Sequence, residues 1–287
     1  MKQLLFLIEV LVAMFAASCS KTSNPTAPVR IHVEDFTITV NKFSDTKATD
    51  PADYDNVKGI TLALFAGDTE VYSATQSKSD PSSFTTFGEF SCELPIGVYS
   101  LVVVARQVGT DDVFALTSPT SAGYTSERPR ETFCNTQVVT ITNTNPMDLS
   151  VTLSRIVSAL NIVSTDNRPE GITKIRTIYG KGSKSFNPSS GLALDDNGFT
   201  LTNTPSAAVG SPINVTSFVF LNTDEETMDI TIEALGANDV VLYSKTLQDV
   251  SFKRNRKTKA SGTIFTTSGS AGFQLNTDWL TDSEVAL

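Results

Sequence analysis

The sequence predicts an all-β protein. Short stretches in which apolar and polar residues alternate recur along the chain, which is the period of half-buried strands. Clusters of Gly, Pro, Asn and Asp separate these stretches, and no long amphipathic helix pattern interrupts them. With 287 residues, of which 40% are hydrophobic, the chain is long enough for two β-sandwich domains or one large β domain.

The first half of the chain contains the clearest strand patterns. The apolar run at 101–104 predicts a central strand, covering 99–105, that is buried on both faces. The polar stretches at 78–83 and 118–130 are expected to be loops. Strands are expected at 30–33, 36–40, 60–64, 70–74, 90–94, 99–105, 113–116 and 137–141.

A polar turn cluster at 143–146 is the best candidate for a domain boundary. In the stretch that follows it, Ile156, Leu160 and Val163 would share one face of a helix, but the β-branched content favours a strand. The clearest hairpin signal is the turn at 236–239. Strands are expected at 149–153, 155–163, 199–201, 212–215, 218–221, 228–235, 240–247, 250–252, 262–266 and 273–275.

The first nineteen residues have the pattern of a secretory signal. Lys2 gives a positive start, an apolar run extends to Phe15, and small residues precede Cys19. The run is too short to span a membrane, and no later apolar run approaches about 18 residues. A cysteine directly after small residues resembles the lipobox of bacterial lipoproteins, which implies lipid on Cys19. The alternative is an ordinary signal peptide cut near Ser18.

After Cys19 the segment 20–28 is small, polar and interrupted by proline, as in a flexible tether. Several acyl chains on one residue would give stable anchoring, because each buried CH₂ contributes about 0.8 kcal/mol. The expected divisions are therefore a signal peptide at 1–18 and a lipidated tether at 19–28, with the membrane contacted through the N-terminal lipid.

Composition excludes several classes of function. A net charge of −9 and a pI near 4.7 argue against a nucleic-acid partner. His32 is the only histidine and is expected on a strand surface, so neither a multi-histidine metal site nor a catalytic triad is predicted. The acidic stretches at 195–196 and 224–226 are interpreted as a turn and a solvated loop tip. No catalytic residue, metal or cofactor is predicted, and the protein is expected not to be an enzyme.

A basic patch at 253–259 carries five cationic side chains among seven residues. The preferred interpretation is a positive strand edge that discourages unwanted strand pairing. The alternative is attraction to anionic lipid headgroups or polysaccharide.

The chain has three cysteines. If Cys19 carries lipid, Cys92 and Cys134 remain. They form either a disulfide, which an exported protein permits, or two buried free thiols, and the sequence favours neither alternative.

Three stretches, at 93–103, 153–162 and 250–266, together resemble the fimbrillin-like family of Gram-negative gut and oral anaerobes, in particular its lipidated anchor subunits. The first, ELPIGVYSLVV, is similar to the family's approach to a central strand. The second, LSRIVSALNI, is similar to the strand that opens the second domain. The third contains RNRKT and GTIFT, similar to the family's C-terminal pattern.

The resemblance implies two tandem transthyretin-like (Greek-key) β-sandwiches, expected at 29–145 and 146–287. It also implies a fimbrial anchor or assembly subunit at the outer membrane and cell surface, which binds other fimbrial subunits by strand exchange and supports adhesion. Shaft subunits of the family are cleaved after Arg or Lys, so Arg30 is a candidate maturation site for a shaft or tip role.

A second function class is a glycan-binding lipoprotein, for a host or bacterial surface ligand, that uses aromatic residues such as Trp279 and Tyr124. An enzyme is the least favoured class, because no acid/base constellation is visible.

Overall fold

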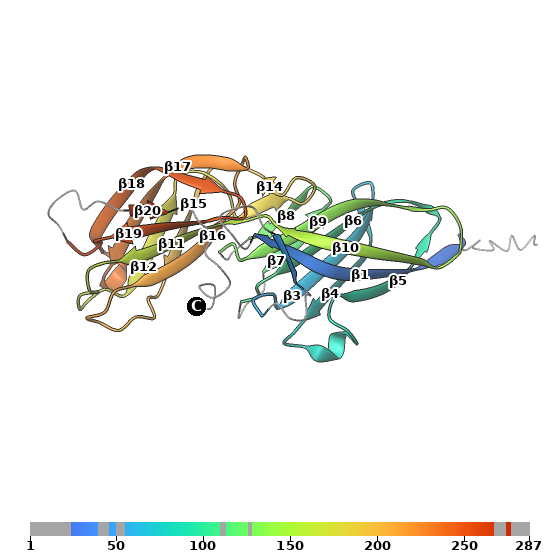
Figure 1. Cartoon of the computed structure of the whole chain (residues 1–287), viewed down its shortest axis with the longest axis horizontal. Helices are drawn as coiled ribbons and strands as arrows, with labels where there is room; N and C mark the ends of the chain where they lie inside the picture. Colours follow the sequence, from blue (N-terminus) through green and yellow to red (C-terminus); the bar gives the residue numbers. More distant parts are fainter. Residues whose placement is uncertain are drawn as a thin grey trace, which may run out of the picture.

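The computed structural model describes residues 24–39, 46–49, 55–109, 113–125, 128–266 and 274–276, with the backbone alone at 35–39, 46–49 and 274–276. The prediction of an all-β protein is confirmed. The described residues form β-strands and two short 3₁₀ turns, Pro81–Ser83 and Ala237–Asp239. Figure 1 shows an elongated molecule in which two groups of strands follow one another along the long axis.

The first half is a two-layer sandwich. One layer is antiparallel, in the order β4-β3-β6-β9; the other has β1 between β5 and β10, with β2 beside the end of β1. β10 meets β9 only at Ser154 and Arg155, so the layers join at one corner. The bounds are β1 Thr26–Thr39, β2 Thr46–Thr49, β3 Gly59–Ala66, β4 Thr69–Ser77, β5 Glu89–Pro95, β6 Gly97–Arg106, β9 Thr132–Ile141 and β10 Met147–Arg155.

Alternation along β6 explains how this sandwich packs. Leu101 and Val103 point into the first core, which also contains Ile31 of β1, whereas Val102 and Val104 point to the opposite side of the sheet. All five side chains are at most 1% exposed. The prediction that 99–105 is buried on both faces is therefore confirmed.

A third layer covers the far side of β6 and is built from both halves of the chain. It has the order β14-β13-β8-β7, with β7 at Phe114–Ser118, β8 at Ser121–Tyr124, β13 at Ser185–Asn187 and β14 at Leu192–Ala193. Phe186 stacks on Phe220 with ring centroids 4.6 Å apart, beside the buried Tyr124. The expectation of a continuous loop at 118–130 was wrong, because β8 is stabilised by pairing with β13, more than sixty residues later.

The second half is another sandwich of two four-stranded sheets, ordered β16-β11-β19-β20 and β15-β12-β17-β18. Its core contains Leu160, Ile162, Ile175 and Ile230, all fully buried. The bounds are β11 Ser158–Ser164, β12 Lys174–Tyr179, β15 Phe199–Asn203, β16 Asn214–Val219, β17 Glu225–Leu235, β18 Val241–Lys253, β19 Lys257–Gly262 and β20 Gln274–Asn276. A strand therefore forms at 158–164, and β17 and β18 form the hairpin expected around 236–239.

Strand pairing continues past residue 145, where the sequence suggested a boundary. β10 pairs in parallel with β1 of the first sandwich, and the chain passes to the second sandwich at Ile156 and Val157. The two strands expected at 30–33 and 36–40 are one strand with an irregularity between Val33 and Asp35. Its first three residues, 26–28, come from the stretch expected as tether.

Candidate functional site

The N-terminal strand β1 completes the core of the first sandwich. It pairs antiparallel with β5 over Thr26–His32 and in parallel with β10 from Val29 to Thr37. Its inward side chains Ala27, Val29, Ile31 and Val33 are each at most 1% exposed. A strand near the start of the chain therefore occupies a groove between two other strands, where backbone pairing and apolar pockets hold it.

Arg30 lies in the middle of this paired strand, and its side chain points to solvent. The bond that follows it, to Ile31, is flanked by β5 on one side and β10 on the other, since Arg30 is opposite Ser91 and Asp148. A protease that needs an extended, accessible substrate reaches this bond only when β1 leaves the sheet.

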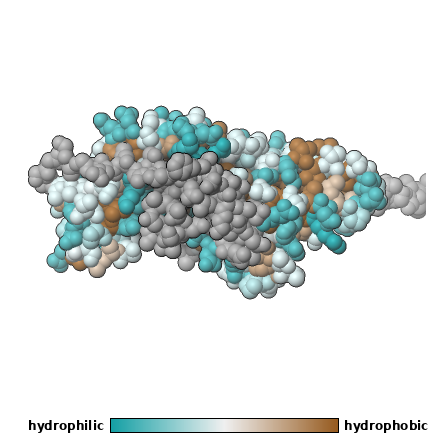
Figure 2. Space-filling model, in the orientation of Figure 1, coloured by the Kyte–Doolittle hydropathy of each residue, from teal (hydrophilic) through white to brown (hydrophobic). Residues whose placement is uncertain are grey.

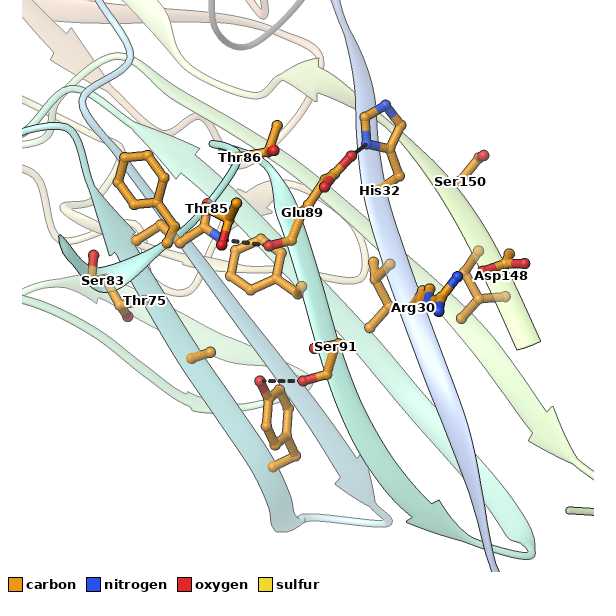
Figure 3. A pocket seen from close by; sticks show the side chains of 17 residues that line it. Arg30, His32, Thr75, Ser83, Thr85, Thr86, Glu89, Ser91, Asp148 and Ser150 are labelled. Carbon is orange, nitrogen blue, oxygen red and sulfur yellow. Dashed lines mark hydrogen bonds and ion pairs between the residues drawn. The ribbon is translucent and has the colours of Figure 1, made fainter. Parts of the chain in front are cut away.

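Beside β1 is a cleft of about 690 Å³, lined by parts of β1, β4, β5, β10 and the turn that contains Phe84. Figure 3 shows Arg30 next to Asp148, and His32 directed toward Glu89. His32 Nδ1 lies 3.7 Å from Glu89 Oε1, with both side chains about half exposed. His32 is thus on the strand surface, as the sequence predicted.

Two side chains of β4 contact the outer edge of β5 within this cleft. Gln76 Nε2 donates to the carbonyl oxygen of Glu89 at 2.6 Å, and Gln76 Oε1 accepts from the amide of Gly88 at 2.7 Å. Tyr72 donates its hydroxyl to the carbonyl oxygen of Ser91 at 3.3 Å. Burial, with a smaller contribution from Cys92, raises the pKa of Tyr72, so it remains a donor at neutral pH. These contacts were not predicted from the sequence, in which the β4 residues were expected only as half of a hairpin.

A second cluster of polar groups lies where the two sandwiches meet. Arg155 Nη2 is 2.6 Å from Glu131 Oε1, and the two side chains are 0% and 4% exposed. Arg155 Nη1 donates to Asn255 Oδ1 at 3.0 Å, and its guanidinium lies over the Phe133 ring at 5.0 Å. Arg155 and Asn255 belong to two of the three stretches, 153–162 and 250–266, that resemble the fimbrillin-like family. The structure brings these two stretches into contact at the junction between the sandwiches.

The basic and acidic stretches noted in the sequence meet on the β17–β18 hairpin. Lys253 pairs with Glu225, and Arg254 Nη2 lies 2.6 Å from Asp224 Oδ1. The opposite charges lie side by side on neighbouring strand ends, which favours a role at a strand edge over an open cationic surface. Asp195, expected in a turn, accepts a hydrogen bond at Oδ1 from the amide of Asn197 at 3.2 Å, and Gly198 has φ +66°.

Cys92 and Cys134 are free thiols in the structure. Cys92 packs against the first core from β5, whereas Cys134 lies in the cluster on the other side of the β6–β9 sheet. Burial raises the pKa of Cys92 to about 11 and that of Cys134 to about 12. Both thiols therefore stay protonated and poorly nucleophilic at neutral pH.

The other predicted residues fall outside this region. Tyr124 is 1% exposed and donates or accepts a hydrogen bond with Thr132, so it does not form an open aromatic platform. Cys19 and Trp279 lie outside the described residues. Within the described ranges, no group of three or more His, Cys, Asp or Glu side chains is arranged to hold a metal. In the same part of the chain, no helix has the length and apolar character needed to cross a bilayer.

The fold and site define a class: all-β proteins with two consecutive sandwiches, in which an N-terminal strand closes the first core. Residues 25–286 match the model of DUF6562, which is described as a family of unknown function. The chain belongs to this family. No curated protein sequence matches the chain.

Solved structures share the fold at low sequence identity. A candidate polysaccharide-binding protein from Bacteroides thetaiotaomicron has a TM-score of 0.52 and 13% identity, covering 88% of this chain and 96% of its own. A candidate adhesin from Bacteroides ovatus also has a TM-score of 0.52 and 13% identity, with coverage of 92% and 99%. The fimbrial anchor protein Mfa2 from Porphyromonas gingivalis has a TM-score of 0.53 and 9% identity, with coverage of 88% and 98%. At these identities the likeness establishes the fold alone.

Proposed function

We propose that the protein is a non-catalytic cell-surface lipoprotein, held in the outer membrane by lipid on Cys19, that serves as a fimbrial anchor or assembly subunit. It binds neighbouring subunits by strand exchange and supports adhesion. The observation that carries the proposal is β1, which fills a groove between β5 and β10 with four buried side chains. A groove of this kind accepts an extended segment from its own chain or from a neighbour.

The fold of Mfa2, a fimbrial anchor, supports the same function. The signal pattern that ends at Cys19 fits a subunit that stays at the membrane. An anchor keeps its own β1 in place and offers another part of its surface to the fibre. A shaft or tip subunit matured after Arg30 instead loses residues up to Arg30 and receives a replacement strand.

The deciding experiment is the intact mass of the protein purified from its native membrane. A chain that begins at Cys19 and carries acyl groups supports the anchor. A chain that begins at Ile31 without lipid overturns it in favour of a polymerising subunit. The matched variant is Cys19→Ala, which should leave the carbonate-washed membrane fraction or accumulate as precursor. Retention of that variant in washed membranes contradicts the lipid anchor.

Glycan binding is a second candidate function, favoured by the cleft beside β1. Its volume of about 690 Å³ lies in the usual range for ligand sites, and it combines hydroxyl and charged groups with the aromatic side chains of Phe84 and Tyr72. Saturable retention on immobilised glycans that is lost in Phe84→Ala but kept in Tyr243→Ala, on the second sandwich, would support this function.

A further inference from the structure

The outer face of the β4-β3-β6-β9 sheet is covered at one end and bare at the other. Toward the second sandwich, the third layer buries Val102 and Val104 completely. Toward the opposite end, Val98 of β6 is 62% exposed and Val138 of β9 is 72% exposed. Val98 and Val138 therefore lie on the same face of the sheet as Val102 and Val104, but they are exposed because the third layer does not extend over them.

These two valines belong to one patch. Val98 is opposite Thr140 and Val138 is opposite Ser100, so the valines are diagonal neighbours on one face of the sheet. Ile96, 49% exposed, lies in the turn just before β6. We name Ile96, Val98 and Val138 the tip patch. Figure 2 shows apolar surface gathered on the part of the molecule where β1 begins.

The turns attached to the patch ends of β6 and β9, at 95–97 and 142–146, carry no charged side chain, whereas the β3–β4 turn at the same end carries Asp68, with Glu70 close by. The residues at 142–146 are all exposed. Because the patch side chains are apolar and the turns of their own strands are neutral, the patch itself favours an apolar partner over an ionic one.

The N-terminal segment reaches the body at this same end. Thr26 is the register partner of Pro95, and the amide of Ile96 donates to the carbonyl oxygen of Pro25 at 3.4 Å. Pro25 is six residues after Cys19, and six fully extended residues span at most about 22 Å. A lipid on Cys19 would therefore hold Pro25, and Ile96 beside it, within about 22 Å of the bilayer surface.

We infer that the tip patch rests on the lipid surface, with Ile96, Val98 and Val138 in the headgroup region. This inference depends on the proposed lipid anchor, which brings the patch to the membrane. The contact places the end of the first sandwich that carries the patch nearer to the bilayer than the second sandwich. Because the three patch side chains are apolar, the contact requires neither anionic lipid nor low ionic strength.

The test uses a tryptophan reporter in the lipidated chain on vesicles of phosphatidylethanolamine and phosphatidylglycerol. The chain has one tryptophan, so Val98→Trp in a Trp279→Phe background gives a single reporter at the tip. Val241→Trp in the same background is the control, since Val241 is 42% exposed and lies in the second sandwich. Circular dichroism confirms that both variants fold.

We expect the emission of the tip reporter to shift to shorter wavelength and to be quenched by brominated lipid, equally at low and high salt. The control reporter should remain in water. A vesicle-bound protein whose tip reporter is not quenched overturns the inference, including the case in which that reporter becomes buried only when another fimbrial subunit is added.

Vesicle flotation separates this result from failure of the proposed function. If the native chain carries no lipid and does not float, the lipid anchor is wrong. The tip patch is then tested by joining a maleimide phospholipid to the Cys19 thiol, in a background with Cys92→Ser and Cys134→Ser, and reading the same reporters. Tip quenching in that sample upholds the surface contact by itself, and its absence refutes it.

Discussion

Arg155 at the end of β10 donates a hydrogen bond from Nη1 to Oδ1 of Asn255, 100 residues later in the chain. Asn255 has φ +58°, and its amide donates to the carbonyl oxygen of Val157 at 2.9 Å. The turn between β18 and β19 is therefore fixed against the point where the chain leaves the first sandwich. With Glu131 on the other side of the guanidinium, these contacts hold the two halves in one arrangement.

Removing the charge of Arg155 should destabilise the protein strongly. Arg155→Met breaks the buried ion pair with Glu131, and we expect a loss of about 3–5 kcal/mol in the free energy of unfolding. Urea denaturation measures it. The control is Lys174→Met, which breaks the exposed pair with Asp239 and should cost at most about 1 kcal/mol. Equal losses for the two variants would contradict the structural role of Arg155.

A disulfide can test whether β1 must leave its groove. Val29 is the register partner of Cys92, and directly opposite residues on antiparallel strands lie within reach of a disulfide. Val29→Cys should therefore form a bond with Cys92 under oxidation and lock β1 to β5. An anchor that keeps β1 should still support fibre assembly when locked. Assembly that stops on oxidation and returns on reduction would show that β1 is exchanged.

The two native thiols should be unreactive in the folded protein. Because burial raises the pKa of Cys134 to about 12, maleimide at pH 7.5 should label it only after unfolding. The half-buried Cys92 should react slowly, since its pKa is about 11. Mass spectrometry under native and denaturing conditions measures both. Identical masses with and without reductant are expected for the wild type.

The same shift gives a pH dependence of stability. Above about pH 8.5 the thiol of Cys134 ionises in the unfolded chain but stays protonated in the folded one. The unfolded state then binds fewer protons, so the free energy of unfolding falls as pH rises from about 8.5 toward 12, by at most about 1.4 kcal/mol per pH unit from this group. Cys134→Ala should show a shallower decline. An unchanged slope would mean that this thiol is solvated.

Glycine is required at position 198 for two reasons. Its φ is +66°, and a Cβ there would lie 2.2 Å from the carbonyl oxygen of Tyr179. Gly198→Ala should therefore cost about 3 kcal/mol or more, from backbone strain and from displacement of β12. Gly67→Ala is the control, because Gly67 has φ +63° and open space around it, and should cost about 1 kcal/mol. Thermal unfolding of the two variants compares them directly.

Much of the fold follows from local pattern. The buried run at 101–104 and the turn at 236–239 identify a central strand and a hairpin, because alternation and turn chemistry are local properties. β8 could not be predicted in this way. Its four residues, SAGY, are ordinary loop composition, and it is a strand because it pairs with β7 on one side and with β13, from the other half of the chain, on the other.

Less of the candidate site than of the fold could be predicted from the sequence. The alternation Leu149, Val151, Leu153 places Arg155 at an inward position, which is a signal that a buried partner exists. The partner, Glu131, comes from the end of a stretch that reads as polar loop, so it could not be identified. The contacts of Gln76 and Tyr72 with β5 depend on how two sheet edges approach each other, which no local pattern encodes.

The parallel pairing of β1 with β10 also determines how the molecule carries load. The proposed tether would pull β1 from its beginning at Thr26, while the second sandwich would pull β10 from its end at Arg155. Both strands run along the long axis of the molecule (Figure 1), so these two pulls act in opposite directions on adjacent strands. The hydrogen bonds between Val29 and Thr37 and their β10 partners are then sheared together, and they do not open one after another. A surface protein exposed to flow would gain mechanical resistance from this geometry at the strand closest to its point of attachment.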